Sequence, residues 1–197
     1  MNKKILNITD LENFIFAKLS NELSPDLSYH GINHTKSVLN CCREYAKRMN
    51  ISPYNSFLLD TAALMHDTGY LVAFDEHEEK SKEYARELLP HWNYSADEIE
   101  QICGMIDATK IPQKPNTTLE QIIADSDLDY LGTDKFYTVG EMLYKELKAL
   151  KIISMRKEWL RLQVNFLKKH IYHTPFAKRY REPVKLKHLE EIINDLN

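Results

Sequence analysis

One stretch limits the fold of this 197-residue chain more than any other, the segment TAALMHDTGY from Thr61 to Tyr70. Its first half is apolar and suits the centre of a helical bundle, and it then ends abruptly in the pair His66-Asp67. Gly69 follows closely and predicts a helix stop. A histidine and a carboxylate at the end of a buried helix are costly unless they gain hydrogen bonds, an ion pair or a metal ion. The segment therefore predicts a central helix that ends in a polar site, and we favour a divalent cation as its partner.

The remaining sequence predicts helices joined by short connections. Glycine is scarce, with five in the whole chain, and this argues against a β sandwich. Helix-start signals recur: capping boxes at Thr9–Glu12, Ser95–Glu98 and Thr117–Glu120, and N-cap/proline pairs at Ser52-Pro53 and Thr174-Pro175. We expect an all-α bundle of about eight to ten helices, over residues 9–23, 30–49, 53–67, 75–89, 96–109, 119–131, 134–150, 154–172, 175–181 and 183–196.

Charge is unevenly distributed along the chain. The formal net charge is −3, but residues 1–144 carry −10 and residues 145–197 carry +7. The basic tail suits an anionic ligand or nucleic acid, but basic faces of amphipathic helices against an acidic body explain it as well. We favour the second interpretation, which leaves nucleic-acid binding through residues 145–197 as the weaker option.

The sequence also bears on compartment and assembly. No run approaches the roughly 18 apolar residues of a membrane span, so no membrane partner is expected. The cysteines, Cys41, Cys42 and Cys103, are odd in number and lack Cys-x-x-Cys spacing. They predict reduced thiols in a cytoplasmic protein rather than a disulfide framework or a zinc knuckle. A homodimer is compatible with the sequence, which leaves the oligomeric state open.

Two further segments carry residues suited to metal chemistry. His30 and His34 stand four residues apart, so on one helix they would share a face and converge on one site. Asp125, Asp127 and Asp129 interrupt an otherwise apolar helix, where aspartate is unfavourable unless it has a partner. We expect these helices to pack around the same apolar core as the central one.

The order His…His-Asp…Asp resembles the HD superfamily of metal-dependent phosphohydrolases, which are all-helical enzymes. The resemblance covers roughly residues 25–135 and implies a single domain over 1–197, in which helices 134–197 pack on that catalytic core. It implies that one divalent ion (Mn²⁺, Mg²⁺, Fe²⁺, Co²⁺ or Ni²⁺) is held by His34, His66, Asp67 and Asp127. Asp125 is the alternative ligand; whichever aspartate does not bind is expected to orient His34 or a water molecule. Asp129 is expected to face solvent.

The segment Tyr-His-x-x-x-His, residues 29–34, is similar to one in cyclic-nucleotide phosphodiesterases. There the first histidine protonates the leaving oxygen, so the resemblance gives His30 the role of general acid; a hydrogen bond from His30 to a nearby carboxylate is the structural alternative. The chain departs from those enzymes at Tyr70, where they carry a histidine. That departure argues against cyclic-nucleotide cleavage and against a tight two-metal centre.

Four more residues are candidates through the same resemblance. His77 stands where many HD proteins bring a histidine to the substrate phosphate or to a second metal, although an exposed helix position explains it equally well. Asp107 stands where two-metal members carry a histidine, and a lone aspartate there favours one ion. Thr109 and Lys110 follow, with Lys110 as a possible phosphate clamp at a helix end. Trp159, Phe166 and Leu167 are expected to be core residues.

These observations predict hydrolysis of a phosphate ester, most simply of a nucleotide, by metal-activated water. Asp67 would both bind metal and accept the proton of the water, and His30 or His77 would protonate the leaving oxygen. Two alternatives stay open: a phosphodiesterase for a cyclic or alarmone nucleotide, and a nucleotide-binding regulatory module without turnover.

Overall fold

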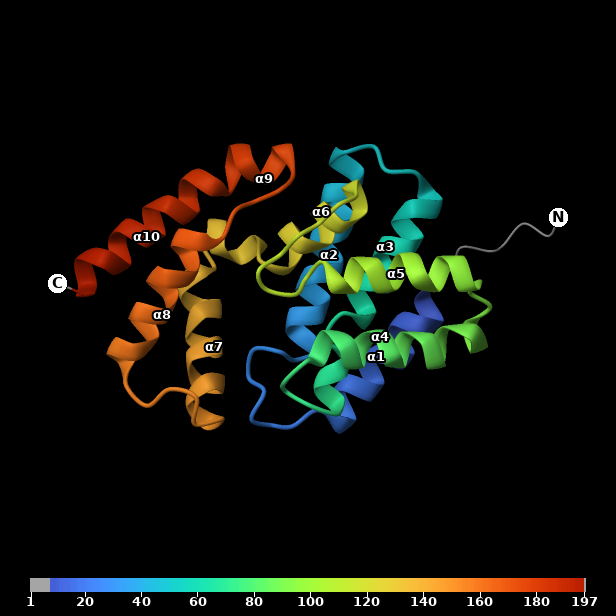
Figure 1. Cartoon of the computed structure of the whole chain (residues 1–197), viewed down its shortest axis with the longest axis horizontal. Coiled ribbons are helices and arrows are strands. Elements are labelled where there is room, and N and C mark those ends of the chain that lie inside the picture. Colours follow the sequence, from blue (N-terminus) through green and yellow to red (C-terminus); the bar gives the residue numbers. More distant parts are fainter. Residues whose placement is uncertain (1–7, 197) are drawn as a thin grey trace.

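The computed structural model describes residues 8–196, and the chain within them is all-α (Figure 1). No strand occurs in that range, which confirms the predicted fold class. The α-helices are α1 (Thr9–Glu22), α2 (Ile32–Arg48), α3 (Pro53–Met65), α4 (His77–Leu88), α5 (Ala96–Asp107), α6 (Thr118–Asp127), α7 (Phe136–Ala149), α8 (Arg156–Lys169), α9 (Pro175–Tyr180) and α10 (Glu182–Leu196). Short 3-10 helices follow three of them: η1 (Thr68–Leu71), η2 (Leu89–Trp92) and η3 (Asp129–Gly132).

Helix α3 forms the centre of the main core. It contacts α1, α2, α4, α5 and α6, and every residue from Thr61 to Met65 is buried. Full burial of a side chain such as Leu64 or Met65 stabilises the fold by roughly 1.5–3 kcal/mol relative to exposure. The prediction of a central helix that leads into His66-Asp67 is therefore confirmed, and the pair is held at the base of this core.

Most of the predicted helix starts are confirmed. Ser95 and Thr117 each form a complete capping box with the glutamate three residues later. Ser52 and Thr174 each accept a hydrogen bond from an amide of the first turn and precede a proline. The first helix differs, because it already includes Thr9 and has Ile8 at the N-cap position.

Three helix boundaries differ from prediction in ways that shape the site. Helix α2 begins at Ile32 rather than His30, because Gly31 takes an extended conformation at its N-cap. Helix α3 ends at Met65, so His66 and Asp67 lie just beyond its last turn. The helix predicted to run to Leu131 ends at Asp127 and continues as η3. The polar residues of the site are thus found at helix ends rather than along helix faces.

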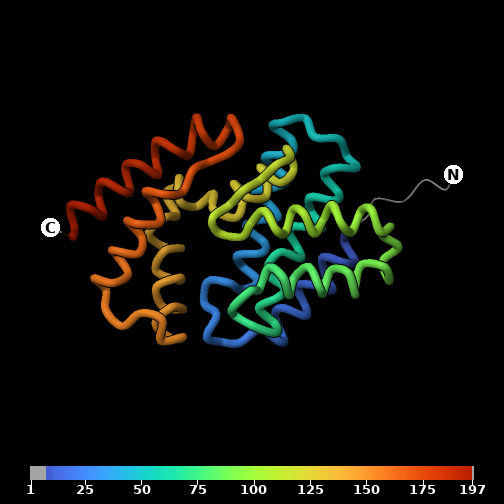
Figure 2. Tube along the Cα trace, in the orientation of Figure 1, coloured from blue at the N-terminus to red at the C-terminus, as the bar shows by residue number. Residues whose placement is uncertain are grey.

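The C-terminal helices form a second packed unit beside the main core (Figures 1 and 2). Helix α8 packs against α10, and α7 against η3. Their apolar residues form two small clusters, one around Phe136, Leu167 and Ile192 and one around Leu147, Ile153 and Trp159. None of the described helices is long and apolar enough to cross a membrane.

Candidate metal centre and the adjoining cavity

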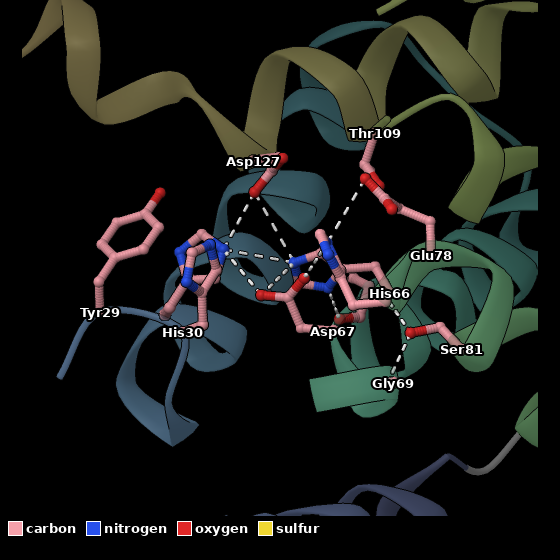
Figure 3. A network of polar contacts seen from close by, with 12 residues as sticks. Tyr29, His30, His66, Asp67, Gly69, Glu78, Ser81, Thr109 and Asp127 are labelled. Carbon is pink, nitrogen blue, oxygen red and sulfur yellow. Dashed lines mark hydrogen bonds and ion pairs between the residues drawn. The ribbon is translucent and has the colours of Figure 1, made fainter. Parts of the chain in front are cut away.

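Four side chains converge where the ends of α3 and α6 meet α2. Nε2 of His34, on α2, lies 3.0 Å from Asp127 Oδ1 and 3.4 Å from Asp67 Oδ2. Nε2 of His66 lies 3.2 Å from the same Asp67 oxygen and 3.3 Å from His34 Nε2. Figure 3 shows Asp127 reaching the cluster from α6 on one side and Asp67 from the opposite side. The structure thus brings together the four residues that the sequence grouped as ligands.

Local hydrogen bonds hold His66 in position. Its Nδ1 lies 2.9 Å from the carbonyl oxygen of Ala63, one turn back in α3. Ser81, on α4, donates to the backbone oxygen of His66 at 2.6 Å and accepts from the amide of Gly69 at 2.8 Å (Figure 3). The bond to Ala63 assigns the proton to Nδ1, which leaves the lone pair of Nε2 directed at the cluster.

The cluster is deficient in positive charge. The Nε2 lone pair of His66 faces two other electron-rich atoms, and Asp67 Oδ2 is buried without any hydrogen-bond partner among the described residues. Burial lowers the pKa of His66, but the Asp67 and Asp127 carboxylates outweigh it and raise that pKa to about 9. The site therefore attracts either protons or a cation. His34, His66 and Asp127 are close enough together to hold one ion, and Asp67 lies beside them.

The other two aspartates of the 125–129 segment have structural partners. The oxygens of Asp125 accept hydrogen bonds from the amides of His173 (2.8 Å) and Thr174 (2.7 Å) at the start of α9. This corrects its assignment as an alternative ligand or an orienting group for His34. Asp129 does not face solvent as expected, because it accepts from Tyr45 Oη and Arg181 Nε, both at 2.7 Å.

Glu146, which the sequence did not single out, holds the loop that carries His30. One carboxylate oxygen of this buried α7 residue accepts hydrogen bonds from the backbone amides of Tyr29 (2.7 Å) and His30 (2.9 Å). Its other oxygen is hydrogen-bonded to Nδ1 of His30. Burial raises the pKa of Glu146, but His30 and the two amides outweigh it and bring the pKa below its ordinary value. His30 therefore reaches the site through a carboxylate from α7, and not through a shared helix face with His34.

Tyr70 contacts the two remaining histidines. Its ring stacks on His30 at 4.3 Å and on His77 at 4.0 Å between ring centroids, and the two imidazoles stand 6.1 Å apart. His77 begins α4, with its Nε2 3.7 Å from Asp67 Oδ1 and 3.5 Å from Glu78 Oε1. The structure thus places His77 beside the cluster, next to the oxygen of Asp67 that faces away from His34.

A cavity of about 180 Å³ adjoins the cluster and is lined by Asp67, Asp127, His30, His77 and Thr109 at that end. Two predicted binding residues lie outside it. Lys110 and Asp107 line a neighbouring depression instead, and Asp107 is paired with Lys82 at 2.6 Å. Helix α5 ends at Asp107 and the chain then turns, so that Thr109 and Ile111 of this segment line the cavity.

Sequence comparison now identifies the family. A family model described as HD domain matches residues 31–152, well over half of the chain. The chain belongs to the HD domain family. The match spans all four clustered residues, His77 and Glu146. None of the curated proteins compared with the chain matches it.

Two solved structures share this HD fold over nearly their whole length. One is a predicted HD superfamily hydrolase from an uncultured Thermotogales bacterium, with 18% identity, a TM-score of 0.61 and coverage of 96% of this chain and 93% of that one. The other is a protein from Lactobacillus plantarum, with 18% identity, a TM-score of 0.66 and coverage of 99% and 98%. At this identity the likeness supports the fold alone.

Proposed function

We propose that this HD domain protein is a metal-dependent phosphohydrolase that cleaves a phosphate ester. The observation that carries the proposal is the buried convergence of two imidazole nitrogens and two carboxylates, in which Asp67 Oδ2 has no hydrogen-bond partner within residues 8–196. Two histidines and two aspartates suit an ion that prefers five or six ligands, such as Mn²⁺, Mg²⁺, Fe²⁺, Co²⁺ or Ni²⁺. When bound, such an ion acidifies a water molecule and polarises a phosphoryl oxygen.

The residues around the cluster provide the proton transfers. In the hydrolysis a water oxygen bonds to phosphorus, the ester P–O bond breaks, and the leaving oxygen takes up a proton. Asp67 has its second oxygen, Oδ1, on the side of His77, where it can accept the proton of the water. His30 is anchored through Nδ1 by Glu146, which leaves Nε2 to protonate the leaving oxygen. His77 is the alternative donor.

Within the class of phosphate esters, the sequence favours a nucleotide as the substrate. A cyclic- or alarmone-nucleotide phosphodiesterase is the second candidate, supported by the anchoring of His30 and opposed by Tyr70 in place of a histidine. A regulatory module that binds a nucleotide without turnover is the third. It is disfavoured by the complete set of four clustered residues, since a module without turnover has no need of them all.

The test combines metal analysis with turnover. Purified wild type would be assayed with Mn²⁺ for phosphate or nucleoside release from 5′-nucleotides, cyclic nucleotides and simple phosphate monoesters, beside Asp67→Ala and the matched carboxylate variant Asp107→Ala. We expect wild type and Asp107→Ala to bind about one ion and turn over, and Asp67→Ala to lose both properties. Metal without turnover on any compound would favour the regulatory module, and no metal in any variant would refute the proposal.

A further inference from the structure

The cavity beside the candidate metal centre has two chemically different ends. One end carries the carboxylates of Asp67, Asp127 and Glu78 and the imidazoles of His30 and His77. The other is built by η3, α7 and α8 and is apolar, with the side chains of Leu128, Leu131, Phe136, Leu143, Trp159, Leu162, Phe166 and Leu167. Among the described residues, the polar groups at that end are the amide of Gln163, the phenol of Tyr130 on η3 and the indole N–H of Trp159. A ligand that spans the cavity therefore needs a polar head and an apolar body.

The lining also limits the charge of the ligand. Within residues 8–196 no lysine or arginine lines this cavity, although the C-terminal helices that wall it are rich in both. Recognition of a polyphosphate depends on several cationic donors, and the described lining offers, beside the candidate metal centre, the imidazoles of His30 and His77 among three carboxylates. A single phosphoryl group finds partners there, but the further charges of a di- or triphosphate chain do not.

Hydrogen-bonding capacity at the apolar end is equally limited. A sugar or a nucleobase placed there would bury several donors and acceptors against one amide, one phenol and one indole N–H, and each unsatisfied polar group opposes binding. The apolar lining suits an apolar group of modest size instead. An apolar cavity of roughly 150 Å³ holds a benzene molecule, and the whole cavity, its polar end included, measures about 180 Å³.

We propose that the substrate is a phosphate monoester of an uncharged, apolar alcohol whose organic group lies between α7 and α8. This rests on the proposed function for the phosphoryl end, and it selects against nucleotides. The organic group contacts Trp159, Phe166 and Leu143, and the phosphoryl group lies at Asp67 and Asp127. Hydrolysis releases inorganic phosphate and an apolar alcohol.

Occupancy of the apolar end can be measured without turnover. The chain has two tryptophans, so Trp92→Phe leaves the buried, cavity-lining Trp159 as the sole reporter. We expect benzyl alcohol and benzyl phosphate to change its fluorescence saturably, and glycerol and ribose 5-phosphate not to. In the same background Leu143→Phe fills the cavity and should weaken benzyl binding at least tenfold. Met142→Phe is the matched control on the same helix, because Met142 is exposed and does not line the cavity.

Turnover then separates the two proposals. With Mn²⁺ present, benzyl phosphate should exceed glycerol phosphate and AMP in kcat/KM by at least tenfold, and ADP and ATP should be inert. Saturable benzyl binding without hydrolysis of any ester would overturn the proposed function and leave the cavity assignment standing. Faster hydrolysis of AMP than of benzyl phosphate, or benzyl binding that Leu143→Phe does not weaken, would overturn the cavity assignment alone.

Discussion

At the scale of single residues, Tyr70 fixes the orientation of the His30 and His77 rings by stacking on both. Its ring contacts both imidazoles face to face, while the His30 and His77 centroids stand 6.1 Å apart. A histidine at this position would add a ligand, but a tyrosine adds a ring that packs against both imidazoles instead. Aromatic stacking of this kind contributes about 0.5–1.5 kcal/mol per pair beyond the area that it buries.

Replacement of Tyr70 by alanine should loosen both imidazoles while leaving the four clustered residues in place. We expect kcat to fall by up to about 10²-fold, because misplacement of a catalytic group by 1 Å can cost that much. Metal content should stay near one ion per chain, and Tyr70→Phe should keep most of the activity. Loss of metal in Tyr70→Ala would show instead that the ring supports the cluster itself.

At the scale of elements, α7 is joined to the loop before α2 by Glu146. Its carboxylate is hydrogen-bonded to two backbone amides and one imidazole. Glu146 therefore fixes the position of His30, although the two residues are 116 positions apart in the sequence. Ser28 strengthens the same junction by donating to the backbone oxygen of Met142 at 2.9 Å. The general acid assigned to His30 thus depends on the docking of α7.

Glu146→Gln should lower kcat with little change in KM and reduce stability by about 1 kcal/mol at pH 7. The pKa of Glu146 is below its ordinary value, so its ionisation stabilises the fold fully above the unfolded pKa of about 4.3. That contribution disappears as the pH falls through the lower folded pKa. Urea unfolding of both proteins from pH 7 to pH 3 should show the difference between them shrinking below about pH 4.3. A constant difference across this range would contradict the assignment.

The contact between η1 and α4 depends on Gly69. Its φ is not positive, and α3 already ends at Met65, so Gly69 is not there to end that helix with a left-handed conformation. A Cβ at this position would lie 1.9 Å from the backbone oxygen of His77 and 2.9 Å from the amide nitrogen of Ser81. The glycine is needed because the backbones of two elements approach each other closely beside the site.

Gly69→Ala should therefore push α4 away from η1, with a loss of stability of about 1–3 kcal/mol, as for other overpacked sites. Gly104→Ala is the matched control: it lies inside α5, and its Cβ would be 3.5 Å from the nearest atom, Glu120 Oε1. Alanine there should be neutral or stabilising by up to about 1 kcal/mol. Thermal unfolding of the two variants should differ in this direction, and equal effects would contradict the close-contact explanation.

At the scale of the whole molecule, the cluster joins three separate helices. His34 lies on α2, His66 and Asp67 follow α3, and Asp127 ends α6. A cation held by all four would tie these helices together in the folded state alone. Binding to the native state stabilises it in proportion to RT ln(1 + [L]/Kd).

Saturating Mn²⁺ should thus raise the Tm of the wild type, with about 2.7 kcal/mol of stabilisation at a concentration 100-fold above Kd. A chelator should reverse the shift. The same addition should leave the Tm of Asp127→Ala nearly unchanged, and differential scanning fluorimetry would compare the two. An equal shift in both proteins would place the ion elsewhere.

The sequence by itself determined the helical fold and most helix starts. These depend on local signals: Ser95 and Thr117 begin helices with bonds to their own first turns, and the run from Thr61 to Met65 is apolar enough to require burial. The resemblance to the HD superfamily indicated His34, His66 and Asp67, and favoured Asp127 over Asp125. Asp125 and Asp127, in contrast, have nearly identical sequence surroundings. Only the tertiary structure separated them, because the partners of Asp125 come from residues 173 and 174.

Only the tertiary structure, likewise, decided what surrounds the cluster. Glu146 and the apolar wall of α7 and α8 come from parts of the chain far from the motif, and Trp159 and Phe166 read as ordinary core residues in the sequence. Lys110 seemed a natural phosphate ligand, yet the turn after α5 directs it into another depression. Residue type and spacing determine which atoms can bind a cation. The packing of distant helices decides which of them meet, and what kind of ligand fits beside them.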